Sequence, residues 1–517
     1  MGTAEVELAE PTMLGWLSDY GLDVEYVRSS GNTLFAKQAD GSEKPVLDFA
    51  GGYGSVLLGH NNPELVELAR ELLADGTPIH AQFSRHPYAN RLANELNAVL
   101  HREFGVSEPY YAVFANSGAE AVEAAVKHAE LDRGHRVRAV VEAVGSAVAA
   151  ARAAVDGGAL VDEEAYREFG VASGDFGALA DRLVALAGEA ASRRPVFLAL
   201  EGGFHGKLVG STQLTHNPGY REPFSALARP TRFVALNRPE SVREVLEPER
   251  VWLREPVVVD GVVRLTDREL PVVTAFLLEP VQGEGGIREV EAEFAKEIGA
   301  ACEEAGVPVV VDEVQSGMGR CGAFFASSQI GLRGDYYALS KSLGGGIAKA
   351  AVMLVRGKHY RGDFELVHSS TFAKDSFSCT VALRALALME ADGGRAYRVA
   401  AERGQRLAGV LESIRADHPD LVLEVRGRGL MLGLELRDQS GSANAAVAGQ
   451  AAAGMLGYAV AGYLLREHAI RLFPTASATS TLRFEPSLHV SDEEIARLEN
   501  GLRDVMAVLG DPVRGLV

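Results

Sequence analysis

Apolar runs recur along the middle of the chain, and helix-forming stretches separate them. Residues 307–311 are Val-Pro-Val-Val-Val, and similar runs occupy 195–200 and 272–278. A run without polar alternation is typical of a strand that is covered on both faces. Helical patterning lies between the runs, for example at 293–305. The pattern over residues 110–346 therefore predicts an α/β fold with a largely parallel central sheet.

Polar side chains follow the 307–311 strand, at the edge where parallel sheets place their ligands. Asp312, Glu313 and Gln315 come directly after it, and Lys341 precedes three glycines, where the backbone can bend sharply. Pyridoxal phosphate requires a carboxylate that keeps its pyridine nitrogen protonated and a lysine that forms an imine with its aldehyde. Either residue alone is a common surface group, so the prediction rests on the pair.

These motifs resemble those of the class III aminotransferases of fold type I. The matching stretches are D-E-V-Q-S-G-M-G-R-C-G at 312–322 and S-K-S-L-G-G-G at 340–346. The resemblance covers nearly the whole chain outside two inserts. It implies pyridoxal 5'-phosphate as cofactor, held as a Schiff base by Lys341. It also implies a large cofactor-binding domain at 61–390 and a smaller α+β domain built from 1–60 and 391–517.

The resemblance also assigns cofactor contacts residue by residue. Asp312 would hold the ring nitrogen and Gln315 the ring hydroxyl, while Val314 and Phe204 would pack on opposite ring faces. The matching positions are Ser117, Gly118, Ala119, Phe204, His205, Asp312, Val314, Gln315, Lys341 and Thr371.

A phosphate site is predicted where a strand meets a helix. Ser117, Gly118 and Ala119 follow the strand candidate at 110–114 and open a helix, whose free N–H groups and dipole favour an anion. An ordinary helix cap is the alternative. Thr371, in a His-x-Ser-Thr-Phe motif, would reach the phosphate of a neighbouring subunit, which implies a homodimer with shared active sites. Residues 373–376 depart from the family's usual Gly-Gly-Asn-Pro.

Three further residues match substrate-binding positions of ornithine-type enzymes: Tyr53, Glu284 and Arg483. The arginine would bind the carboxylate of glutamate or 2-oxoglutarate through its bidentate fork. Glu284 would cover it when an amine or aminoketone binds instead. A structural ion pair and a turn aromatic packed on glycine are the alternative interpretations.

The expected reaction is transamination in two half-reactions, moving an amino group from an amino acid or amine to a ketone or aldehyde. A racemase, decarboxylase or aminomutase of the same family would use the same residues. A noncatalytic scaffold is disfavoured because Asp312, Gln315, Lys341 and Thr371 are all intact.

The two inserts depart from the family. Residues 134–194 are rich in alanine and helical in character, and we expect an inserted helical subdomain there. Residues 248–271 predict a β-hairpin with a tight turn at Asp260-Gly261. Together with the altered loop at 373–376, they favour a specialised substrate, in secondary metabolism, over a central metabolic one.

Composition restricts the partners and the compartment. A net charge of −19 over 517 residues argues against nucleic acid or an anionic membrane as partner. Three widely spaced cysteines predict neither a disulfide framework nor a metal site, so a reducing cytoplasm is expected. Residues 443–465 are nearly free of charge but rich in alanine and glycine, and we interpret them as a packed helix or helix pair instead of a membrane span.

Overall fold

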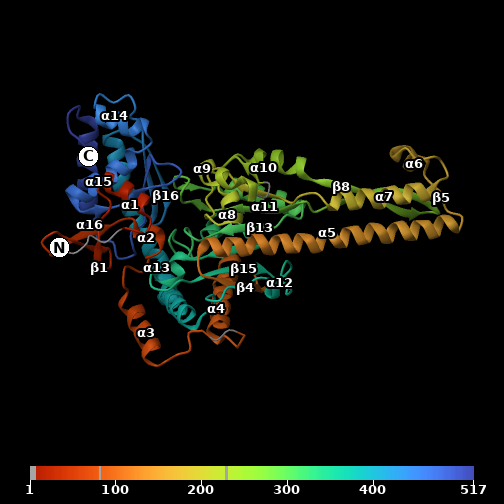
Figure 1. Ribbon diagram of the computed structural model, residues 1–517, viewed down its shortest axis with the longest axis horizontal. Coiled ribbons are helices and arrows are strands. Elements are labelled where there is room, and N and C mark those ends of the chain that lie inside the picture. Colours follow the sequence, from red (N-terminus) through yellow and green to blue (C-terminus); the bar gives the residue numbers. More distant parts are fainter. Residues whose placement is uncertain (1–6, 81–82, 228–230, 517) are drawn as a thin grey trace.

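The computed structural model describes residues 7–80, 83–227 and 231–516, which form two domains and a projecting arm (Figure 1). The large domain is built on a seven-stranded sheet and the small domain on two four-stranded sheets. Segments near both ends of the chain meet in the small domain. The arm extends away from both domains.

The central sheet is mostly parallel. Its five strands β14, β13, β10, β6 and β7 pair in parallel, and β15 runs antiparallel to both of its neighbours. The order across the sheet is β4 (Tyr110–Ala115), β15 (Ala351–Arg356), β14 (Tyr336–Leu339), β13 (Val309–Asp312), β10 (Val273–Leu278), β6 (Val196–Leu200) and β7 (Thr231–Val234). The predicted fold class is confirmed.

Alternate side chains of the central strands enter two different cores. In β6, Leu198 and Leu200 join the core that includes α4 (Pro87–Phe104) and α11 (Ala292–Glu304). Phe197 and Ala199 face the opposite core, which α5 (Gly118–Asp156) covers. Every residue of β10, β13 and β14 is buried, which is why their sequences are mostly apolar, with Thr274 and Asp312 as exceptions.

The small domain joins both ends of the chain. One sheet contains β1 (Tyr26–Ser30), β2 (Thr33–Lys37), β3 (Glu43–Asp48) and β18 (Ile470–Arg471); the other contains β16 (Val422–Arg428), β17 (Met431–Leu436), β20 (Thr481–Phe484) and β19 (Phe473–Pro474).

Helices complete the small domain. Helix α13 (Ser376–Asp417) has non-helical backbone at 391–394, close to the expected domain boundary. Residues 443–465 form a helix pair, α14 (Ala445–Ala452) and α15 (Leu456–His468), as predicted. No helix in the described part of the chain is long and apolar enough to cross a membrane. Other helices are α1 (Pro11–Asp19), α3 (Pro63–Ala74) and α16 (Asp492–Gly510).

The two predicted inserts form one arm. The first does not begin as a new helix near residue 134, because α5 runs without a break for 39 residues, from Gly118 into the insert, and ends at Asp156. Helix α7 (Phe176–Ala191) returns toward the sheet, and the hairpin of β8 (Val251–Val259) and β9 (Val262–Leu270) packs with α5 and α7. Asp260 and Gly261 both have positive φ, as the predicted tight turn requires.

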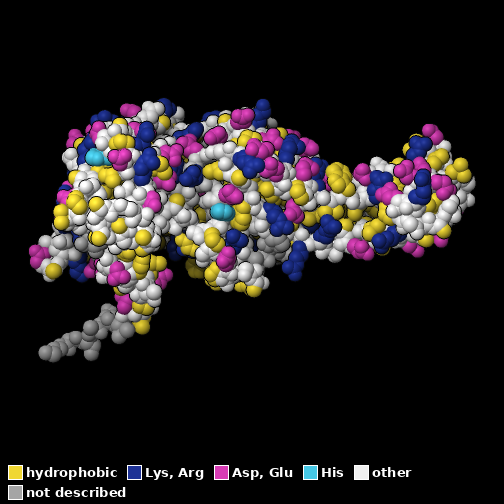
Figure 2. Space-filling model, turned by 90° about the horizontal axis from the view of Figure 1, so that it is seen from above, with side chains coloured by type: hydrophobic (Ala, Val, Ile, Leu, Met, Phe, Trp, Pro, Cys, Tyr) yellow, Lys and Arg dark blue, Asp and Glu magenta, His cyan; other side chains and the backbone are white. Residues whose placement is uncertain are grey.

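The arm has its own hydrophobic core. Val144 of α5, Leu179 and Leu183 of α7, and Val263 of β9 are all buried in it. Figure 2 shows the arm as a narrow extension whose outer end carries charged side chains of both signs. A separate core implies that the arm can loosen without disturbing the large domain.

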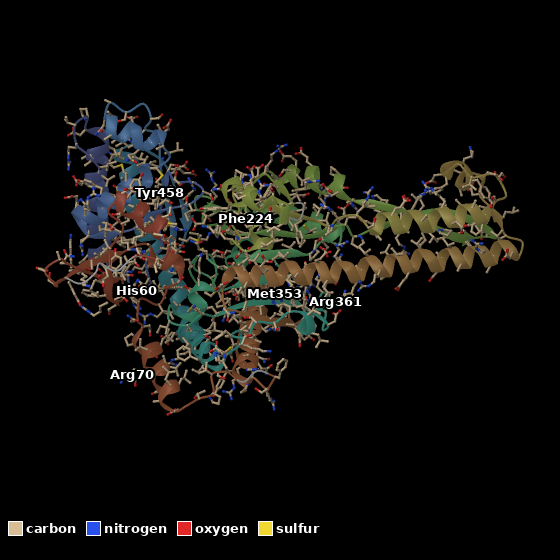
Figure 3. All side chains as sticks on the ribbon, in the orientation of Figure 1. His60, Arg70, Phe224, Met353, Arg361 and Tyr458 are labelled. Atoms are coloured by element: carbon tan, nitrogen blue, oxygen red, sulfur yellow. The ribbon has the colours of Figure 1, made fainter. Side chains whose placement is uncertain are left out.

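A buried charge cluster attaches the middle of α5 to the central sheet. Asp132 accepts a hydrogen bond from Arg361 Nε (2.7 Å), and its other oxygen lies 3.1 Å from His359 Nδ1. Arg361 lies beside α5 (Figure 3). Nε2 of His359 faces Asp335 Oδ1 at 3.4 Å. Burial alone would lower the pKa of His359, but the two aspartates outweigh burial and raise it.

We expect Leu179→Ala to destabilise the arm by about 3 kcal/mol, because it opens a cavity in the arm's own core. Hydrogen exchange should increase in α7 and the hairpin while the cofactor spectrum is retained. Val184→Ala, at a position of α7 that is 48% exposed, is the matched control. Loss of the cofactor in parallel with loss of arm protection would contradict an independent arm core.

The His359 cluster predicts a pH-dependent contribution to stability. Because the folded-state pKa is raised, the contribution is complete below the ordinary value near 6.5 and is lost as pH rises through the folded pKa. His359→Gln should cost about 3 kcal/mol at pH 6, and the cost should shrink toward pH 9. Thermal unfolding across this range measures it, with the exposed His489→Gln as control. A pH-independent difference would contradict the ion-pair account.

Candidate active site

Lys341 lies in a strained turn directly after β14. It begins the short 3₁₀ helix η4 (Lys341–Gly344) and has φ 46°, which costs a non-glycine residue about 1 kcal/mol or more. The next turn accepts only glycine, because a Cβ at Gly345 would lie 2.3 Å from Leu65 and one at Gly346 2.8 Å from Val56. The surrounding packing therefore holds the lysine in place.

A hydrogen-bonded chain leads from Lys341 into the small domain. Its Nζ donates to Gln315 Oε1 (2.8 Å), and Gln315 Nε2 donates to Glu485 Oε1 (2.8 Å). Glu485 is fully buried, with Oε2 3.6 Å from Arg483 Nε. Burial lowers the pKa of Lys341, although Glu485 and Glu284 oppose the shift.

Glu485 was not among the predicted site residues. It follows Arg483 by two positions at the end of β20, where an extended chain turns both side chains to one side. That spacing is the signal that could have identified it.

Asp312 ends β13 and is paired with His205. One carboxylate oxygen lies 2.9 Å from His205 Nδ1, and the other accepts the Val314 N–H (3.1 Å). Burial would lower the pKa of His205, but Asp312 outweighs it and raises the pKa. In the described part of the chain, His205 Nε2 is buried without a hydrogen-bond partner.

A second acid, Glu279, also escaped prediction as a site residue. Its two oxygens accept the N–H groups of Phe204 (2.8 Å) and Gly283 (3.0 Å). Burial raises the pKa of Glu279. This acid therefore joins the loop that carries Phe204 to the loop that carries Glu284.

The predicted phosphate turn lies beside the end of β13. Ser117 caps α5 by accepting the Glu120 N–H (3.3 Å). Gly118 packs against Val314 so closely that an added Cβ would lie 2.6 Å from Val314 Cγ1. The first N–H groups of a helix have no intrahelical partner, so those of Gly118 and Ala119 can bind an anion.

Thr371 lies on an exposed segment near this turn. Its neighbour Ser370 accepts a hydrogen bond from Asn116 Nδ2 (2.8 Å), and Phe372 is 63% exposed. The segment thus lies against the residue that precedes Ser117.

The three predicted substrate residues meet at one place. Arg483 Nη1 donates to Glu284 Oε1 (2.6 Å), and the Arg483 guanidinium lies 4.6 Å from the centre of the Tyr53 ring. Glu284 Oε2 accepts the Ala476 N–H (2.7 Å). Burial would raise the pKa of Glu284, but Arg483 outweighs it and lowers the pKa. The acid is therefore held ionised against the arginine.

These residues line a cavity of about 1150 Å³ between the two domains. Tyr53, Phe204, Glu284 and Arg483 are all on its wall. The predicted substrate residues therefore share one chamber with the predicted aromatic cofactor contact.

The donor set fits pyridoxal phosphate. A half-buried lysine, a carboxylate at the end of a parallel strand and an open helix N-terminus are the groups that bind its aldehyde, ring nitrogen and phosphate. His205 Nε2 is a buried nitrogen without a hydrogen-bond partner among the described residues, and the close contact of Gly118 with Val314 places the helix N-terminus beside the end of β13. Ser117, Gly118, Ala119, Phe204, His205, Asp312, Val314, Gln315 and Lys341 are the residues available to hold it.

Comparison with known proteins agrees with this chemistry. The family model "Aminotransferase class-III" matches residues 19–506. A putrescine aminotransferase from Pectobacterium atrosepticum is 28% identical over 493 residues, covering 95% of this chain and 84% of that protein.

Solved structures share the fold. The ornithine aminotransferase from Toxoplasma gondii has a TM-score of 0.67 at 18% identity, covering 97% of this chain and 95% of that one. A transaminase from the marine bacterium Virgibacillus has a TM-score of 0.69 at 17% identity, covering 98% and 97%. An amine transaminase from an uncultivated Pseudomonas species, in its PLP-bound form, has 0.66 at 19%, covering 98% of each chain.

Fold and site thus define a pyridoxal-phosphate enzyme of fold type I. The chain belongs to the class III aminotransferases, and its reaction is pyridoxal-phosphate-dependent transamination. The family match and the putrescine aminotransferase relative together support transamination.

Proposed function

We propose that Lys341 binds the cofactor covalently and moves the proton of the amine substrate. The observation that carries this proposal is the position of its Nζ, held by Gln315 at the carboxyl edge of the sheet. When bound, pyridoxal phosphate draws electrons from the carbon that carries the amino group. A lysine whose pKa is lowered by burial is more easily neutral, and a neutral amine can accept a proton.

Asp312 and His205 keep a proton at the ring nitrogen. Asp312 presents a carboxylate at the end of β13, and His205 Nδ1 fixes the position of one of its oxygens. Against the effect of burial, the hydrogen bond and the charge of Asp312 raise the pKa of His205, so the two groups hold each other in place. Val314 and Phe204 exclude water from the two faces of the ring.

The start of α5 would hold the phosphate, and a second copy of the chain would complete the site. Ser117, Gly118 and Ala119 supply the N-terminal groups of a long helix. Thr371 from the second copy supplies a further hydroxyl. Exposed apolar side chains around Thr371 support a homodimer: Leu366 (88%), Val367 (69%) and Phe372 (63%).

Arg483 and Glu284 select between two substrates. When Glu284 is bound to Arg483, the cavity wall presents no free cation at this point. Such a wall suits an amine donor, for example putrescine, for which the Pectobacterium relative is named. With Glu284 displaced, Arg483 binds the distal carboxylate of glutamate or 2-oxoglutarate. Tyr53 holds the guanidinium flat in both cases.

The setting of the enzyme is also a proposal. Cys302, Cys321 and Cys379 are buried free thiols, which supports a reducing cytoplasm. The arm and the altered 373–376 segment support a specialised substrate in secondary metabolism.

Lys341→Ala should abolish the absorbance band of the bound cofactor near the violet edge of the visible range. Transamination should fall by at least about a thousandfold, because proton transfer by the lysine is lost. Spectra before and after adding an amine donor measure both effects. Lys296→Ala, an exposed lysine on α11, is the control. An unchanged band in Lys341→Ala would show that Lys341 does not bind the cofactor.

Glu284→Gln should favour the dicarboxylate half-reaction. Without the charge of Glu284, Arg483 no longer has to break a charge-assisted hydrogen bond before it binds the substrate carboxylate. The KM for 2-oxoglutarate should therefore fall about tenfold. The KM for a simple amine should stay the same or rise. Arg483→Gln should raise the KM for 2-oxoglutarate and spare the amine. Equal losses in both half-reactions would indicate a purely structural ion pair.

A further inference from the structure

Much of the active-site cavity lies beyond the residues that bind the cofactor and the carboxylate. Its volume of about 1150 Å³ exceeds the roughly 300–1,000 Å³ of most sites for drug-sized ligands. A five-carbon amino acid would leave most of it unfilled. The cavity therefore indicates a larger substrate, and the side chains of its outer wall indicate the chemistry of that substrate.

Helix α1 and Tyr458 of α15 form part of that outer wall. Met13, Trp16 and Leu17 of α1 line the cavity. The Trp16 ring meets the Tyr458 ring edge to face, with centroids 4.7 Å apart and planes at 80°. Tyr458 lies in the small domain, where α1 and α15 meet (Figure 3). No residue of α1 is fully buried: Leu17 packs against the main core, while Met13 and Trp16 line the cavity.

The C-terminal end of α1 is seated on the small domain. The Tyr20 carbonyl approaches Gly462 of α15 so closely that a Cβ there would lie 2.1 Å from the oxygen. The Tyr20 hydroxyl donates to Gln450 Oε1 of α14 (3.3 Å). These contacts hold Trp16 at a defined place on the wall.

The cations on the cavity wall already have partners. Arg483 binds Glu284, and Arg471 Nη1 lies 3.0 Å from Asp48 Oδ1. Lys207 lies 4.4 Å from the centre of the Tyr220 ring. Apart from Glu10, which is exposed just before α1, the outer wall offers mainly rings and aliphatic groups, so it suits a group without charge.

We propose that the amine or ketone handled by this site carries a long, uncharged apolar or aromatic body that lies against Trp16 and Tyr458. Trp16 is then a specificity-determining residue for that body. The proposal rests on the proposed function, because it takes Lys341 as the point where the amino group reacts.

Binding can be tested without the reaction. The chain has two tryptophans, Trp16 and Trp252, and Trp252 is 52% exposed on β8 of the arm. Trp252→Phe thus leaves Trp16 as the single tryptophan in the holoenzyme. We expect 4-phenyl-1-butanol, which has no amine, to change Trp16 fluorescence saturably, and 1-butanol to do so only at far higher concentration. An unchanged signal with 4-phenyl-1-butanol would overturn the proposal.

Kinetics with 4-phenylbutylamine and butylamine separate specificity from catalysis. Trp16→Ala should lower kcat/KM about tenfold for the phenyl amine and less than about twofold for butylamine, while Trp16→Phe keeps most of the activity. A parallel fall for both amines would overturn the specificity role. If the alcohol changes Trp16 fluorescence but neither amine bleaches the cofactor band, binding of an apolar body at Trp16 is supported and the proposed transamination of such amines is wrong.

Discussion

The two domains meet at a buried arginine, Arg483, that lies between two carboxylates. Glu284 comes from the large domain and Glu485 from the small one, and Gln315 continues the chain to Lys341. Removing one member of such a group leaves an uncompensated buried charge, which costs about 3–5 kcal/mol. The relative position of the domains, the lysine and the substrate arginine are therefore fixed together.

Helix α5 provides the second long-range constraint on the structure. Helix α5 begins at the proposed phosphate turn, passes the buried Asp132 cluster and ends in the arm. The cluster with His359 and Arg361 fixes the middle of the helix on the sheet, so motion of the arm is not transmitted freely to Gly118. A partner or ligand on the arm would have to work through that cluster to affect the site.

Most of the site could be predicted because its residues adjoin strands with unmistakable patterns. Asp312 ends a buried strand, Lys341 precedes three glycines, and Ser117 opens a strong helix. Glu279 and Glu485 were not predicted as site residues, because their importance comes from hydrogen bonds to residues that are distant in the sequence. The two inserts were predicted as separate segments, because their union depends on the packing of α5 and α7 with a hairpin far along the chain.

The sequence by itself determined the class of fold and the cofactor chemistry, and it predicted a lysine and an aspartate for the cofactor site. These follow from local patterns, because buried strands, helix starts and glycine turns are coded over a few neighbouring residues. Only the tertiary structure decided that Arg483 is covered by Glu284, that Trp16 lines the cavity, and that two inserts share one core. Such facts depend on which faces of distant elements meet, and a single chain's local pattern leaves that open.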